Sequence, residues 1–300
     1  MLHISDEHID KVVKPETVNY LEDYDVNTAL RRAEIYVESV IQEIIYGMTR
    51  YKFDELVVLC YGDHIDGAIH GLEDASYFRN SFASAIAAGQ LHALMVRDLA
   101  PFFKKVRMVY CMGNHGRMTE KKDFRNPLRN LDYLVGETCS AYLRDIDNIE
   151  IEIPPTNVSV NIDIKGWKFN VSHGDDLTAA NMPLNAAKRR SERLDRVHIA
   201  KGEIIPYKVM GHLHDCGTVP TANGETLMNG SWMHTDVYAY AKGFVSDACQ
   251  LVHGVRASQG VTWRRPIFLA SENEKNGPKR YKLEFAASHY KEMMPNQGVL

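Results

Sequence analysis

The chain has 300 residues, of which 45% are hydrophobic and 25% charged, and its net charge is −4 at pH 7. This composition indicates a globular protein with a sizeable core and excludes a disordered or collagen-like chain. No apolar run approaches the ~20 residues that a membrane-spanning helix needs, and no secretory signal is visible at the start. The five cysteines show no CxxC spacing and predict no disulfide framework. We therefore expect an intracellular, cytoplasmic protein that does not bind membranes.

Five apolar runs predict strands, and each run stops at a polar motif. In chain order they are residues 1–4, 56–61, 106–112, 167–171 and 204–210. The second and third runs are short and partly β-branched, as expected of strands that are buried on both faces. Ligands gather at the carboxyl ends of strands in sheets that are flanked by helices. The five motifs are therefore expected to meet at one edge of a central sheet.

Four helices are predicted between these strands. They cover residues 27–50, 73–99, 130–144 and 179–196. The first shows an apolar stripe at helical spacing, with Asn27 or Thr28 as its cap. The second is expected to end before Pro101, because proline does not continue a helix.

Further strands are predicted from alternation and from turn residues. Residues 150–171 alternate between apolar and polar, which indicates antiparallel strands. Residues 218–229 predict a hairpin that turns at Asn223-Gly224. We expect one domain over residues 1–270, followed by a polar, loosely held extension over residues 271–300. The predicted fold class is α+β, with two packed mixed sheets flanked by helices.

The polar motifs at the strand ends combine carboxylates, one amide and imidazoles. They read Asp6-Glu7-His8, Gly62-Asp63-His64-Ile65-Asp66, Gly113-Asn114-His115, Ser172-His173-Gly174 and Gly211-His212-Leu213-His214. This mixture of oxygen and nitrogen ligands suits two divalent metal ions. A single motif would be a weak signal, whereas five in a fixed order at strand ends are specific.

The order D-x-H, G-D-x-x-D, G-N-H, H and G-H-x-H resembles that of the calcineurin-like metallophosphoesterases, and it spans residues 6–214. The resemblance implies a four-layer α/β/β/α sandwich. It also implies phosphoric ester hydrolysis by a hydroxide that bridges two divalent metal ions. Mn²⁺ fits the ligand types and the family habit, while Zn²⁺, Fe²⁺ or a mixed pair are alternatives.

The same resemblance assigns the metal ligands. It implies Asp6, His8 and His214 on the first ion. It implies Asn114, His173 and His212 on the second ion. Asp63 would bridge the two ions, because a carboxylate can offer one oxygen to each.

Three further residues are expected to act on the substrate or on its surroundings. The resemblance implies that His115 protonates the leaving oxygen or stabilises charge on phosphorus. Asp66 is expected to orient a neighbouring side chain by hydrogen bonding. Arg117 either donates hydrogen bonds to a phosphate oxygen or forms a structural ion pair. His64 and His234 lie near motifs, where they either reach the site or serve as ordinary hydrogen-bonding residues.

Two departures from the pattern bear on the substrate. Protein phosphatases of the family usually show G-D-x-x-D-R-G and G-N-H-E, whereas Gly67 and Gly116 stand at the corresponding positions here. The pattern is closer to the nuclease and phosphodiesterase branches and to phage-encoded members. We therefore predict a phosphodiesterase, with DNA exonuclease and endonuclease activity both open. The alternatives are a phosphomonoesterase acting on small molecules or proteins, and a scaffold that keeps the fold without turnover.

Two basic segments, residues 104–129 and 188–196, surround or follow site motifs. A basic rim around a metal site would attract a polyanion such as DNA. The alternative is a helix surface on which basic and acidic side chains form ion pairs at i,i+4 spacing. The sequence leaves both interpretations open.

Overall fold

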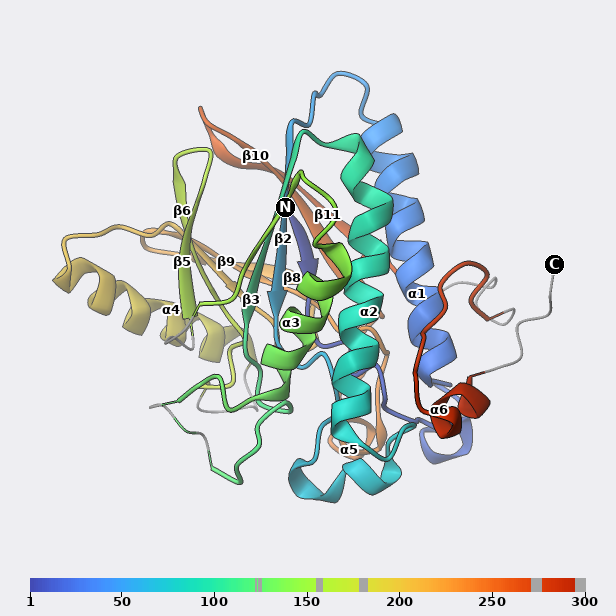
Figure 1. Ribbon diagram of the computed structural model, residues 1–300. Helices are drawn as coiled ribbons and strands as arrows, with labels where there is room; N and C mark the ends of the chain where they lie inside the picture. Colours follow the sequence, from blue (N-terminus) through green and yellow to red (C-terminus); the bar gives the residue numbers. More distant parts are fainter. Residues whose placement is uncertain (122, 124–125, 155–158, 178–182, 271–276, 295–300) are drawn as a thin grey trace.

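The computed structural model describes residues 1–300 except 122, 124–125, 155–158, 178–182, 271–276 and 295–300 (Figure 1). Its strands are β1 (Leu2–Ile4), β2 (Glu55–Tyr61), β3 (Lys105–Cys111), β4 (Ile149–Glu152), β5 (Ser159–Ile164), β6 (Trp167–Ser172), β7 (Tyr207–Met210), β8 (Gly217–Thr221), β9 (Gly224–Met228), β10 (Cys249–Arg256) and β11 (Gly260–Phe268). Its α-helices are α1 (Val26–Ser39), α2 (Ser81–Leu99), α3 (Leu131–Leu143), α4 (Pro183–Ala200), α5 (Val237–Ala241) and α6 (Ser288–Met293).

The strands form two mixed sheets. The first sheet has the order β11-β10-β1-β2-β3-β4 and the second β5-β6-β7-β9-β8. In the first, β1 to β4 run parallel to one another, while β10 is antiparallel to both of its neighbours, β1 and β11. In the second, β6, β7 and β9 run parallel, and β5 and β8 are antiparallel edge strands. Because β1, β2 and β3 are parallel neighbours, their carboxyl ends lie at the same edge of the sheet.

The two sheets pack face to face between helices, because successive side chains of a strand point to opposite faces. Val58 of β2 belongs to a core cluster with residues of α1, α2 and α3. Its neighbour Leu59 belongs to a second cluster, which includes Phe169 of the other sheet. On the outer face of that sheet, Ala187 of α4 packs with Met228. The α+β class and the order helix, sheet, sheet, helix are therefore confirmed.

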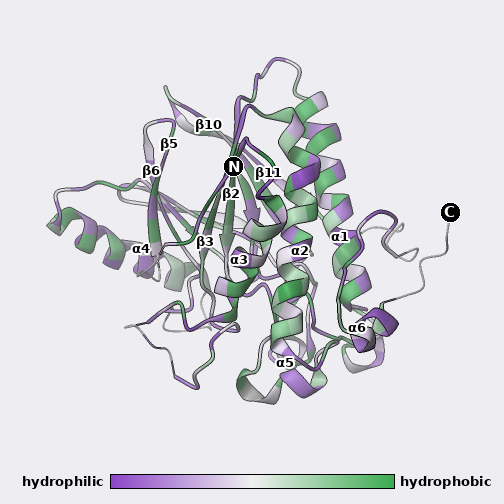
Figure 2. Cartoon of the chain, in the orientation of Figure 1, coloured by the Kyte–Doolittle hydropathy of each residue, from purple (hydrophilic) through white to green (hydrophobic). Residues whose placement is uncertain are grey.

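The hydropathy of α4 agrees with its position on the outer face of the second sheet. Figure 2 shows hydrophobic and hydrophilic residues alternating along α4, as expected of a helix with one buried and one exposed face. No helix in the described part of the chain is long and apolar enough to cross a membrane.

Two predicted helix starts were wrong because neighbouring polar residues provide the caps. The carboxylate of Asp25 accepts hydrogen bonds from the backbone N–H groups of Asn27 and Thr28, so α1 begins at Val26. This helix passes into a π-helical turn over Val40–Tyr46 instead of continuing to residue 50. Asn80 caps α2 in the same way, and Glu73–Ala75 is a separate 3₁₀ turn.

Other elements differ from the prediction in pairing or extent. The strand β4 pairs parallel with β3, so only the later part of residues 150–171 forms the expected antiparallel pair β5–β6. The predicted helix 179–196 begins in residues outside the described part, and α4 runs on to Ala200. The hairpin at 218–229 is confirmed as β8 and β9. The pair β10–β11 was not predicted.

The described part of the C-terminal segment lies against the helical layer. The carboxylate of Glu34 on α1 accepts hydrogen bonds from the backbone N–H groups of three successive residues, 279 to 281. Tyr281 and Leu283 are buried in the core cluster of that layer. The division into residues 1–270 and 271–300 stays a prediction.

Candidate metal centre

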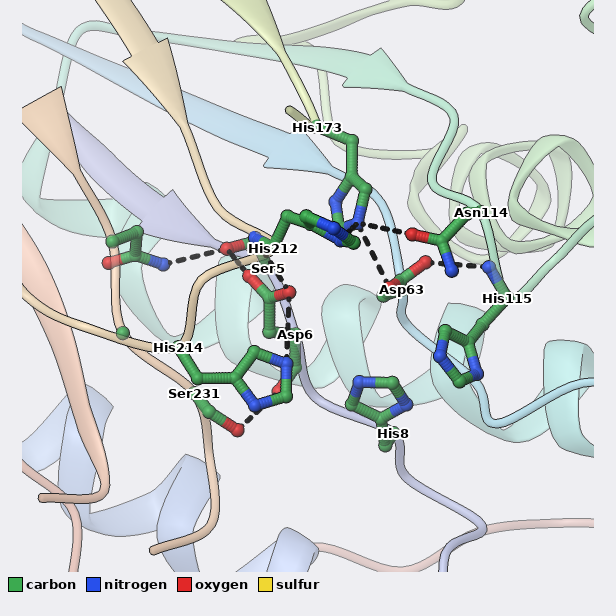
Figure 3. Close-up of polar contacts among 12 residues, drawn as sticks. Ser5, Asp6, His8, Asp63, Asn114, His115, His173, His212, His214 and Ser231 are labelled. Carbon is green, nitrogen blue, oxygen red and sulfur yellow. Dashed lines mark hydrogen bonds and ion pairs between the residues drawn. The ribbon is translucent and has the colours of Figure 1, made fainter. Parts of the chain in front are cut away.

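The loops that follow β1, β2, β3, β6 and β7 meet at one edge of the two sheets, as Figure 3 shows for the side chains that they carry. Backbone hydrogen bonds join the first two loops, since the N–H of His8 donates to the carbonyl of Asp63 at 3.1 Å. The loops after β2 and β3 approach so closely that a Cβ on Gly62 would lie 2.3 Å from the nitrogen of Gly113. The motif glycines are therefore required by this contact.

The predicted ligands gather into two groups within this edge. One group is Asp6, His8 and His214, and the other is Asp63, His173 and His212. In each group, one ligand atom from every residue lies within 4.8 Å of the others. A third group of the same size joins His8, Asp63 and His115 and so links the first two. Four imidazoles and two carboxylates from four loops thus lie close enough to hold two neighbouring ions.

The second group converges on a single point. His173 Nε2 lies 2.9 Å from Asp63 Oδ2 and 3.1 Å from Asn114 Oδ1. His212 Nδ1 lies 3.2 Å from the same nitrogen. His173 Nδ1 lies 3.0 Å from the carbonyl oxygen of Tyr61, which accepts its proton and turns Nε2 toward the group. Oxygen and nitrogen lone pairs that meet in this way are suited to a cation.

The charges in this group depend on one another. Burial alone would lower the pKa of His173, but the carboxylate of Asp63 raises this pKa to about 10. Burial, together with the neighbouring His173, lowers the pKa of His212 to about 4. Without a metal ion, a proton on His173 therefore balances Asp63. A cation bound here would replace this proton, because an imidazole ligand must be neutral at the ligating nitrogen.

The first group leaves a nitrogen without a partner. His214 Nε2 lies 3.4 Å from Asp6 Oδ1, and the Ser5 hydroxyl donates to Asp6 Oδ2 at 2.6 Å. The Nε2 atom of His8 is buried and has no hydrogen-bond partner among the described residues. Because leaving a buried polar atom unpaired is costly, a metal ion at this nitrogen fits the site.

Backbone strain is concentrated on the candidate ligands. Residues other than glycine rarely adopt the left-handed backbone region. Five candidate ligands do so here: Asp6 at φ 55°, His8 at 43°, Asp63 at 55°, His212 at 66° and His214 at 61°. Such conformations cost of order 1–3 kcal/mol each and persist where surrounding contacts fix them, often at functional sites.

His115 and Asp66 lie beside the two groups. The ring of His115 is 4.6 Å from that of His8 and nearly perpendicular to it. Its Nδ1 lies 2.9 Å from the carbonyl oxygen of Asp66 and 3.5 Å from the carboxylate. The same carboxylate lies 3.3 Å from His8 Nδ1 and 2.9 Å from the ammonium of Lys11. Burial would raise the pKa of Asp66, but Lys11 and His8 keep it well below its usual value.

Arg117 is placed differently from the other predicted residues. Its side chain reaches the carbonyl oxygen of Glu120 at 3.5 Å, and its Nε is buried without a hydrogen-bond partner in the described part of the chain. It lines a small cavity of about 20 Å³ next to Gly113 and Asn130. A phosphate contact and a structural ion pair both stay predictions for Arg117.

His64 and His234 make structural contacts. His64 Nδ1 lies 2.6 Å from the Glu7 carboxylate, on the side of the sheet that carries the helices. His234 Nδ1 lies 3.1 Å from the carbonyl oxygen of Ser246. Glu7 and His92, which is also 2.6 Å from that carboxylate, were not singled out as site residues. The signal that points to Glu7 is its position between two ligands, whereas His92 lies in a helix without any motif.

Comparisons with known proteins give structural matches only. No protein-family profile matches the chain, and no curated protein matches it. A solved archaeal phosphodiesterase is similar at 11% identity and a TM-score of 0.40, over 89% of this chain and 98% of that one. A Zn²⁺ complex of Vps29 from Entamoeba histolytica is 13% identical, with a TM-score of 0.36, over 90% and 98% of the two chains. The phosphoesterase YfcE from E. coli is 13% identical, with a TM-score of 0.36, over 89% of this chain and 98% of that one.

These three solved structures are a phosphodiesterase, a Vps29 and a phosphoesterase. The chain itself has two mixed sheets between helices and brings the five motif loops to one edge. The order of the motifs on these loops is the one that resembles the calcineurin-like metallophosphoesterases in the sequence.

Proposed function

We propose that this chain is a metal-dependent phosphoric ester hydrolase that cleaves phosphodiester bonds. The observation that supports it most is the meeting of two ligand groups around Asp63, with His115 beside them. Five loops far apart in the sequence bring carboxylates and imidazoles to this one place, a ligand set that suits two divalent ions.

The proposed cofactors are two divalent ions, with Mn²⁺ favoured and Zn²⁺ or Fe²⁺ as alternatives. Asp6, His8 and His214 would hold the first ion. Asn114, His173 and His212 would hold the second, and Asp63 would contact both. When bound, such a pair supplies positive charge for the phosphoryl oxygens and lowers the pKa of water.

The remaining roles fall to side chains of this chain. His115 would give a proton to the leaving oxygen, because its Nδ1 is held at the Asp66 carbonyl and its Nε2 is the nitrogen left for the substrate. Asp66 would keep the rings of His8 and His115 in place through its carboxylate. Arg117 would contact a phosphate oxygen of a larger substrate.

We expect phosphodiesters to be better substrates than phosphomonoesters. A Cβ on Gly67 would lie 2.0 Å from the carbonyl oxygen of His115, so this position cannot carry the arginine found in protein phosphatases. Without that cation, the second negative charge of a monoester has one partner fewer. With added Mn²⁺, bis(p-nitrophenyl) phosphate should give a higher kcat/KM than p-nitrophenyl phosphate. A strong preference for the monoester or for a phosphopeptide would reverse the ranking, and no turnover of either would favour a scaffold.

DNA is the proposed substrate whose binding can be tested separately from hydrolysis. Arg189 and Arg193 are exposed on α4, whereas Arg190 is buried. Asp176 pairs with Arg190 at 2.6 Å and lies 3.9 Å from the guanidinium of Arg193. If the exposed pair contacts phosphates, Arg189→Ala with Arg193→Ala should flatten the salt dependence of DNA affinity by roughly one to two units of log–log slope.

The matched control is Lys104→Ala with Lys105→Ala. These exposed lysines belong to the basic segment 104–129, but they lie at the start of β3, the end away from the metal centre. This pair should leave the salt slope unchanged. Hydrolysis of a small diester should change little in either double variant. An unchanged slope in the α4 variant would show that its basic residues form only a solvated surface.

A further inference from the structure

A buried cluster of one carboxylate and two imidazoles lies directly behind the candidate metal centre. Glu7 stands between Asp6 and His8 in the sequence, and its side chain points into the core beneath α2. Glu7 Oε2 lies 2.6 Å from His64 Nδ1 and 2.6 Å from His92 Nε2. All three side chains are completely buried. None of the three is among the proposed ligands.

The hydrogen-bond directions identify Glu7 as an ionised acceptor. The N–H of Gly62 donates to His64 Nε2 at 3.3 Å, so the proton of this ring lies on Nδ1 and points to Glu7. His92 Nδ1 lies 2.9 Å from the Tyr110 hydroxyl, which can donate to it and leave the proton on Nε2. Both rings can thus donate to the carboxylate of Glu7, which accepts a hydrogen bond from each of them.

The three side chains lie close enough to be considered a cation site of their own. Contacts of 2.6 Å between ligand atoms are, however, those of charge-assisted hydrogen bonds. Ligands of one metal ion at 2.0–2.2 Å from it would stand about 3 Å or more apart. The geometry therefore favours an anchor made of hydrogen bonds.

This anchor joins the elements that carry the ligands. Glu7 lies in the loop of Asp6 and His8, and His64 follows Asp63, so the carboxylate ties the first loop to the second. His92 fixes both to α2. The backbone of Glu7 is held as well, because the hydroxyl of the buried Tyr24 donates to its carbonyl oxygen at 2.6 Å.

The residues on either side of Glu7 need such support. Asp6 and His8 both have left-handed backbone conformations, with φ of 55° and 43°. Strained conformations of this kind persist only where surrounding contacts over-determine them. The hydrogen bonds of Glu7 supply these contacts between the two strained positions.

We propose that Glu7, held by His64 and His92, is a positioning residue that sets the placement of the metal ligands Asp6, His8 and Asp63. This inference rests on the proposed function, since it assigns Glu7 to the same metal centre. Loss of an outer partner of this kind typically lowers metal affinity by roughly 10–100-fold.

The test is calorimetric titration of Mn²⁺ into metal-free protein, without any substrate. Glu7→Gln keeps the size of the side chain but removes its charge, and His92→Leu removes one donor. Both variants should bind Mn²⁺ roughly 10–100-fold more weakly than the wild type. His92→Gln should restore part of the affinity, because its amide can still donate to Glu7.

His253→Gln is the matched control. This histidine is also buried and lies in the same sheet on β10, where its Nδ1 is 2.7 Å from His3 Nε2. It should lower the melting temperature without changing Mn²⁺ affinity. Wild-type affinity in Glu7→Gln, or an equal loss in His253→Gln, would overturn the inference. A wild-type chain that binds none of Mn²⁺, Zn²⁺ and Fe²⁺ in the same titration would instead overturn the proposed function.

Discussion

Asp63→Asn is expected to lose both metal ions and nearly all phosphodiesterase activity. One carboxylate oxygen of Asp63 lies 2.9 Å from His173 Nε2, and the other accepts the N–H of His115 at 2.8 Å. Asparagine keeps one acceptor oxygen and tolerates the left-handed backbone at φ 55°, so the fold should survive. What disappears is the negative charge that both ion positions share. The loss of affinity should therefore exceed the roughly 10–100-fold typical of an outer-shell partner.

Two measurements test this prediction. The metal content after dialysis reports the loss of ions, and the turnover of bis(p-nitrophenyl) phosphate reports the loss of activity. Asp25→Asn is a suitable control, because it makes the same change of side chain at the cap of α1, where asparagine is an equally good cap. This control should keep both ions. Full metal content with full activity in Asp63→Asn would show that Asp63 does not bridge the ions.

The fold and the meeting place of the motifs could be predicted because both depend on local patterns. A buried strand such as β2 shows itself as an apolar run, and the polar residues after it mark its carboxyl end. Once several parallel strands are expected, their carboxyl ends must lie at a common edge. The gathering of Asp6, Asp63 and Asn114 at that edge follows from these two steps.

The surroundings of the ligands could not be predicted, because they depend on contacts between distant residues. Glu7 and His92 are 85 positions apart, and their contact exists only because α2 packs on the first sheet. The sequence likewise gives no sign that position 67 lies against the His115 carbonyl, where no side chain fits. In the sequence, Gly67 therefore looks like a replacement of the family arginine. In the structure, the closeness of the His115 backbone is enough to explain why glycine stands there.

His115→Ala is expected to keep both metal ions and to lower kcat by about 10²–10⁴-fold, the range typical of a lost general acid. The interaction of this residue with Asp63 runs through its backbone N–H at 2.8 Å, and alanine keeps it. The side chain is 21% exposed, and its Nδ1 is fixed at the Asp66 carbonyl. Its Nε2 is thus the nitrogen that an incoming substrate meets.

Metal content and steady-state kinetics of His115→Ala separate this role from that of a ligand. An unchanged metal content with a lower kcat and a similar KM is the expected result, because the ring acts on the leaving group. His289→Ala removes an exposed histidine on α6 and should change neither quantity. Loss of one ion in His115→Ala would contradict the assignment. It would instead make this ring a ligand, as its grouping with His8 and Asp63 also permits.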